Sequence, residues 1–173
     1  MATVSDIKAL FGSASSFELA ALVLQGAAEP LCWAVAPSKA VCYAFAVEAY
    51  YKVLISIEGG EYPANEHHLL TLHECCSDAS QKRLEREWWA DNVEYLQRLR
   101  KNPEWDADVP RNLRSALSLA AKAFIDFRYR DSPRPMNFQL RNAGALQRRI
   151  ILEKRPDLRQ PAPSPFLLLN PEP

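Results

Sequence analysis

The stretch PSKAVCYAFAVEAYYKVLISIE, from Pro37 to Glu58, decides the fold, and it is followed at once by Gly59-Gly60. Its apolar residues recur mostly at intervals of three or four, which is the spacing of a broad helical stripe rather than of a strand. Pro37 suits the first turn of a helix, and the paired glycines suit its end. A helix of about 22 residues is about 33 Å long, enough to cross a small domain. The sequence therefore predicts a central helix around which the other segments pack.

Two charged residues interrupt this helix, Glu48 and Lys52. Their i, i+4 order, with the acid first, is the favourable one, and an exposed pair of this kind contributes about 0.3 to 0.5 kcal/mol. If the pair is buried, desolvation costs several kcal/mol per ion, and the two groups need further partners. The sequence leaves two interpretations open, a solvated stripe and a buried or interfacial acid.

Length and composition favour one domain. The chain has 173 residues, of which 48% are hydrophobic and 24% are charged, and these shares are ordinary for a soluble globular protein. Charged residues and proline interrupt the most apolar region, so we expect no membrane span. The first residues lack a basic segment leading into an apolar one, which predicts no secretory signal and a cytoplasmic location.

The cysteines and histidines do not predict a metal site or a cofactor. Four cysteines suit a reducing compartment as free thiols. His73, Cys75 and Cys76 are close in sequence, but neighbouring helical positions point about 100° apart and do not easily share one tetrahedral metal. No two of the three histidines have the i, i+4 spacing of a helical metal site.

The remaining patterns are also helical, and no strand-like alternation of useful length is present. We expect an all-α fold, a single bundle of four to five main helices, with a helical domain over residues 1–155 and a proline-rich tail over residues 156–173. In the tail, Phe166-Leu167-Leu168-Leu169 is too apolar for a simple spacer, and two interpretations stay open, a peptide that docks on the domain or on a partner protein, and plain packing. Besides the central helix, we expect a short first helix that is separated from a second one, residues 17–28, by a break at Ser13, Ser15 and Ser16. After the central helix we expect a helix over residues 66–76, and then one that is capped by Asp78 or Ser80 and ended by Asn102-Pro103. The last two expected helices are an apolar stripe from Leu113 to Phe127 and a helix from about Asn137 to Lys154.

Charge is distributed unevenly along the chain. Residues 1–82 carry four lysines, no arginine and nine acids, whereas residues 83–173 carry 17 basic residues and 12 acids. The arginine-rich end suits phosphate, because the guanidinium fork binds phosphate oxygens in pairs. The alternative is a solvated helix face. The predicted phosphate-binding residues are Arg128, Arg130, Arg134, Arg141, Arg148 and Arg149.

Three segments resemble the HEPN superfamily. They are Ala44 to Leu54, which resembles that family's A-x-E-x-x-x-K helix; His67 to Leu72, which is similar to its His-Asp-Leu-x-x-Leu segment; and Phe127 to Arg130, which resembles an Arg-Tyr near the end of a later helix. The resemblance implies a helical, commonly dimeric protein of the kind found in prokaryotic toxins, defence systems and RNA processing. Many such proteins are metal-independent ribonucleases in which an arginine precedes a catalytic histidine by four to six residues.

This chain lacks that catalytic pair, because its first arginine, Arg83, follows its last histidine, His73. A rearranged site can still form in space from His67 or His68 with Arg128 or Arg130, since such sites are defined by geometry. Otherwise the two histidines are helix caps or packing residues. The function that we expect is a non-catalytic, HEPN-like domain that binds RNA, a nucleotide or a partner protein, as a homodimer. The alternatives are a ribonuclease with a rearranged site and an adaptor that acts through its tail.

Overall fold

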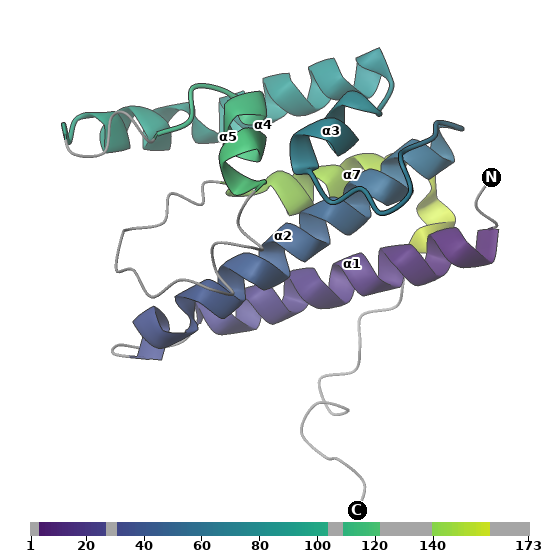
Figure 1. Cartoon of the computed structure of the whole chain (residues 1–173), viewed down its shortest axis with the longest axis horizontal. Coiled ribbons are helices and arrows are strands. Elements are labelled where there is room, and N and C mark those ends of the chain that lie inside the picture. The colour runs from purple at the N-terminus through teal and green to yellow at the C-terminus, as the bar shows by residue number, and fades with distance from the viewer. Residues whose placement is uncertain (1–3, 27–30, 104–108, 122–139, 160–173) are drawn as a thin grey trace, which may run out of the picture.

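The structure, a computed structural model, describes residues 4–26, 31–103, 109–121 and 140–159. Within these ranges every regular element is helical, so the predicted all-α fold is confirmed (Figure 1). The elements are α1 (Val4–Gln25), α2 (Leu31–Ile57), α3 (Leu69–Glu74), α4 (Asp78–Arg100), α5 (Leu113–Ala120), α7 (Ala143–Lys154) and the 3₁₀ turn η2 (Pro156–Leu158).

The helices α1 and α2 run side by side in opposite directions (Figure 1). Aromatic rings join them, with Phe11 and Tyr50 centred 5.7 Å apart and Phe17 and Phe45 stacked at 5.2 Å. In the described part of the chain, α7 and α3 pack against α2, and α5 packs against α3 and α4. The result is a bundle in which α1, α2, α4 and α7 are the main helices, as the sequence predicts.

The expected break at Ser13, Ser15 and Ser16 is wrong, because α1 is continuous through it. The Ser13 hydroxyl donates to the Ala9 carbonyl at 3.1 Å, and the Ser16 hydroxyl donates to the Gly12 carbonyl at 3.0 Å. Serine hydroxyls compete with the backbone unless they bond one turn back within the helix. Here they do so, which removes the reason for a break.

The central helix is longer than predicted at its start and ends as predicted. It begins at Leu31, six residues before Pro37, which therefore lies inside the helix rather than in its first turn. A proline inside a helix removes one backbone hydrogen bond, and its ring crowds the carbonyl one turn earlier. At the other end Gly59 has a φ of +73°, and the Gly60 N–H donates to the Ile55 carbonyl at 3.0 Å. This left-handed glycine ends α2.

Several helix boundaries differ from the predictions because side chains next to the predicted caps take that role. Ser77, rather than Asp78 or Ser80, caps α4, and α3 begins only after His68. The last helix begins at Ala143 rather than near Asn137, and residues 137–139 lie outside the described residues. The stripe after Ala120 and the tail beyond Arg159 also lie outside them. Leu158, in the first residues of the predicted tail, is buried against the domain.

Glu58 joins three elements at the end of α2. Its carboxylate accepts hydrogen bonds from the Ser77 N–H at 3.0 Å and the Ser80 hydroxyl at 2.5 Å, and it pairs with Lys154 at 2.9 Å. Burial by itself raises the pKa of Glu58, but these three partners hold that pKa below its usual value. The start of α4 and the end of α7 are thereby fixed against α2.

Two helical segments, Val4–Gln25 and Ala34–Ile57, are long and apolar enough to cross a membrane by length and composition alone. The sequence analysis predicts no membrane span, because charged residues and proline interrupt the apolar region. A segment of this length can nevertheless contain two charged residues and still be apolar enough to span a membrane. Of the apolar windows, 28% of the first and 61% of the second are buried inside the protein. The second segment is thus mainly a core helix, whereas α1 keeps apolar side chains exposed at Leu19, Leu22 and Val23.

The adjacent tryptophans on α4 give a matched pair for testing the core. Trp88 is fully buried, and its Nε1–H donates to the Arg141 carbonyl at 3.0 Å, whereas Trp89 only packs against the edge of the core. Replacing Trp88 with alanine should lower the free energy of unfolding by about 3 to 5 kcal/mol. Chemical denaturation followed by circular dichroism measures the loss. The same substitution at Trp89 should cost clearly less, and equal losses would contradict this description of the core.

Candidate functional site

The structure divides the predicted phosphate-binding residues into two groups. Arg141 and Arg148 line one hollow, whereas Arg149 does not line it and donates to Glu87 at 2.6 Å. Arg128, Arg130 and Arg134 lie outside the described residues. Of the described residues in the predicted set, Arg141 and Arg148 share this hollow, and Arg148 and Arg149 share a second hollow further along α7.

This basic hollow lies where α1, α2, α4 and α7 meet, and it has a volume of about 490 Å³. Four helices contribute, although their residues are up to 130 positions apart in the sequence. The lining comprises three bases, one acid, two tyrosines, two amides and small apolar side chains: Glu18, Ala21, Leu22, Gln25, Lys39, Ala40, Tyr43, Tyr95, Arg141, Asn142, Ala145 and Arg148.

The floor of the basic hollow is a buried carboxylate, that of Glu18, which is only 6% exposed. The Tyr50 hydroxyl donates to its Oε2 at 2.8 Å, and Arg148 Nε lies 3.1 Å from the same oxygen. Burial raises the pKa of Tyr50 well above its usual value, so its phenol keeps the proton that it donates. The charge of Glu18 is therefore balanced within the protein, and Arg148 is oriented by it.

A glycine lets α7 approach this floor. The Gly144 N–H donates to the Tyr43 hydroxyl at 3.1 Å, and a Cβ at this position would lie 3.4 Å from Glu18 Oε1. Burial raises the pKa of Tyr43 to about 12, so its hydroxyl is neutral and accepts this bond. The first turn of α7 is held against the hollow by contacts that leave little room for a side chain.

The rim of the basic hollow is fixed by α4. Arg141 lies over the ring of Tyr95, with 4.8 Å between the guanidinium carbon and the ring centroid. Its backbone carbonyl accepts from Trp88 Nε1 at 3.0 Å and from Asn92 Nδ2 at 3.4 Å. Both the backbone and the side chain of Arg141 are thus positioned before any ligand arrives, while the side chain stays exposed.

A second cluster joins the residues on which the HEPN resemblance depends. Glu48 Oε1 lies 2.7 Å from Lys52 Nζ and 2.9 Å from His67 Nδ1. Glu48 is only 6% exposed, and its Oε2 has no hydrogen-bond partner among the described residues. The interpretation of Glu48 as part of a solvated stripe is therefore wrong, and the buried acid is what the structure shows.

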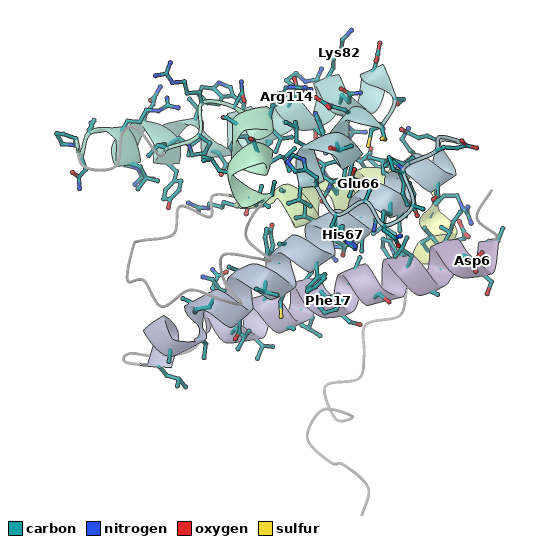
Figure 2. The ribbon with its side chains drawn as sticks, in the orientation of Figure 1. Asp6, Phe17, Glu66, His67, Lys82 and Arg114 are labelled. Carbon is teal, nitrogen blue, oxygen red and sulfur yellow. The ribbon has the colours of Figure 1, made fainter. Side chains whose placement is uncertain are left out.

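The three histidines lie in different surroundings. His67 has a side chain that is 63% exposed, and it lies beside the middle of α2 next to Glu66 (Figure 2). His68 is the N-cap of α3 and accepts from the Thr71 N–H, as the alternative of a helix cap predicts. His73 is fully buried between Tyr51 at 3.2 Å and Glu85 at 3.0 Å. His73 is therefore a core residue whose two ring nitrogens are satisfied by Tyr51 and Glu85.

The described residues contain no group of three or more metal-ligating side chains. Cys42, Cys75 and Cys76 are free thiols, and burial raises the pKa of Cys76 far above its usual value. Such a thiol is a poor nucleophile, because the reactive form is the thiolate.

Sequence reasoning missed most of the basic hollow. Lys39, Tyr43 and Tyr95 sit within helical patterns that predict only packing or solvation, and Glu18 is one acid in an apolar segment. No local signal marks them, because each belongs to a different helix and they meet only after folding. The arginine-rich composition of the C-terminal half is the signal that did identify Arg141 and Arg148.

No family model, curated protein or solved structure matches this chain. The HEPN relationship accordingly stays a prediction from the three segments that carry it. Function is argued below from the geometry of the two sites.

The buried histidine predicts a pH dependence of stability. Burial lowers the pKa of His73, although the hydrogen bond that the ring makes to the Glu85 carboxylate acts in the opposite direction by favouring the charged ring. The unfolded chain binds a proton at this residue as the pH falls below about 6.5, whereas the folded chain binds it only at a lower pH. The free energy of unfolding should therefore fall as the pH is lowered from 6.5 toward 5, measured by urea denaturation.

The pH range in which His73 affects stability is separate from the range in which the carboxylates do. The pKa values of Glu58, Glu87 and Glu153 are lowered, so their contribution is lost only below about pH 4.5. Replacing His73 with glutamine should flatten the dependence between pH 5 and 6.5, whereas His68→Gln should not. Equal slopes in the wild type and the His73 variant would refute the assignment.

Proposed function

We propose that this chain is a non-catalytic binding domain whose basic hollow takes a phosphate-bearing nucleotide unit, either free or within RNA. The observation that carries the proposal is the meeting of Arg141, Arg148 and Lys39 in one hollow with Tyr43 and Tyr95. A domain of this kind is the function that the HEPN resemblance also leads us to expect, in a defence or toxin–antitoxin setting.

The charge of the basic hollow favours an anion. Three bases face it against one acid, and the acid is already paired with Arg148 and bonded by Tyr50. Lys39 and Arg141 form no ion pair with any described residue, because Glu18, the acid in the lining, pairs with Arg148. Guanidinium and ammonium groups that are not neutralised by the protein bind phosphate oxygens through charge-assisted hydrogen bonds.

The size and the neutral lining favour a nucleotide over a bare anion. Small-molecule sites have volumes of about 300 to 1,000 Å³, and this hollow has about 490 Å³. Tyr43 and Tyr95 add aromatic surface to the lining, with Arg141 already over one face of the Tyr95 ring, and the amides of Gln25 and Asn142 offer donors and acceptors to a base edge or a sugar. These features are not needed to hold an inorganic ion.

Calorimetric titration with AMP, without metal, tests the proposal. Replacing Arg141 with alanine should weaken AMP binding about tenfold or more, because a charge-assisted hydrogen bond contributes about 1.5 to 3 kcal/mol. The fold should survive, since the contacts to Trp88 and Asn92 use the backbone carbonyl at this position.

Two controls make this result specific. Lys82→Ala removes the same charge from an exposed position on α4 that points away from the other helices (Figure 2), and it should leave AMP binding unchanged. Adenosine, which lacks the phosphate, should bind far more weakly than AMP. Equal binding of adenosine, or an Arg141 variant that binds like the wild type, would reject the site.

The Glu48–Lys52–His67 cluster favours a second candidate function, a metal-independent ribonuclease. A buried carboxylate that holds Nδ1 of an exposed histidine orients the ring and leaves Nε2 to exchange a proton with a substrate hydroxyl. The phosphate-stabilising residues of the predicted rearranged site, Arg128 and Arg130, lie outside the described residues.

Cleavage of labelled small RNA in the presence of a chelator tests the second function. If the chain is a ribonuclease, His67→Ala should lower the rate by about 10² to 10⁴, the range of general acid–base catalysis. His68→Ala should leave the rate nearly unchanged, because His68 only caps α3. The absence of cleavage by the wild type, or full activity of the His67 variant, would eliminate this candidate.

A further inference from the structure

We propose that the basic hollow continues along α7 into a second hollow, and that the two together hold a short stretch of single-stranded nucleic acid. One nucleotide of this strand occupies the basic hollow, so the inference rests on the proposed function and specifies its ligand. The observation behind it is that two hollows on one helix share lining residues.

The second hollow lies further along α7 and has a volume of about 480 Å³. Ala145 and Arg148 line both hollows, so the two adjoin at these residues. Ala145 is exposed and has only a methyl side chain, which places no bulky group at the junction. The hollows therefore form one track over the exposed face of α7.

Arginines follow this track from end to end. Arg141 lies before α7, Arg148 and Arg149 on it, and Arg159 just after η2. Arg149 gives one nitrogen to Glu87, and the guanidinium has further N–H donors on a side chain that is 55% exposed. Positive groups are thus available at intervals along the track, as a polyanionic backbone requires.

The acids on the track are already paired. Glu18 is held by Arg148 and Tyr50, and Glu153 accepts two hydrogen bonds from Arg83, at 2.6 and 3.1 Å. With Lys39 included, five bases face two acids across the two hollows, and two of these bases, Arg148 and Arg149, are themselves paired with Glu18 and Glu87. The surplus of positive charge on the track favours a ligand with several phosphates.

The dimensions favour a single strand of about five nucleotides. The 12 residues of α7 extend over about 18 Å, and a stacked strand rises about 3.4 Å per nucleotide. A hollow of nucleotide size admits one unpaired base, whereas paired bases in a duplex are stacked inside and do not enter it.

The test compares AMP with oligoadenylates of two, three, five and eight nucleotides by calorimetric titration of the full chain, across a salt series. Affinity should rise with length up to about five nucleotides and then level off, and the salt dependence should steepen with each added phosphate contact. The double variant Arg149→Ala/Arg159→Ala should weaken binding of the five-nucleotide strand about tenfold. Its binding of AMP should stay unchanged, because neither residue lines the basic hollow.

A matched double variant, Lys82→Ala/Arg86→Ala on the exposed face of α4, removes the same charge and should bind every ligand as the wild type does. If AMP binds but longer strands bind no more tightly, the track is refuted and the proposed function stands. If neither AMP nor any strand binds, both are refuted. Tighter binding of a duplex, or equal binding of poly-glutamate, would also overturn the track, in favour of a duplex or a protein ligand.

Discussion

Tyr50 and Tyr51 are adjacent on α2, point in different directions and are both fully buried. A buried phenol needs a hydrogen-bond partner, because an unsatisfied polar group in the core costs about 1 to 3 kcal/mol. Tyr50 finds Glu18 on α1, and Tyr51 finds His73 on α3. These two hydrogen bonds require that α1 and α3 lie on different sides of α2 at a fixed register, and the packing of the other helices depends on that arrangement.

The first of these bonds also connects the core to the surface. Glu18 lies between the Tyr50 hydroxyl and Arg148, and it lines the basic hollow. A buried carboxylate is costly unless it is paired, so α7 has to approach α1 closely enough for Arg148 to reach it. Gly144 permits that approach. The same electrostatic requirement that completes the core thus places an arginine, and the start of α7, at the edge of a hollow.

The two candidate sites use charge differently. In the basic hollow, positive groups outnumber the acid and stay partly unneutralised, which suits the binding of an anion. In the Glu48–Lys52–His67 cluster, the acid is buried and gathers two basic groups around a single oxygen. The second arrangement orients a histidine and leaves it exposed to a reacting molecule. The two candidate sites therefore share no residue.

The sequence by itself determined the helical class, the central helix with its end at Gly59-Gly60, and the basic character of the C-terminal half. These features are local, since apolar periodicity, a left-handed glycine and composition are all read from neighbouring residues. The sequence did not determine the continuity of α1 through Ser13 and Ser16, the burial of Glu48, or the joining of Lys39, Tyr95, Arg141 and Arg148 in one hollow. Only the tertiary structure decided these, because whether a polar side chain is solvated or paired depends on the helix that packs against it.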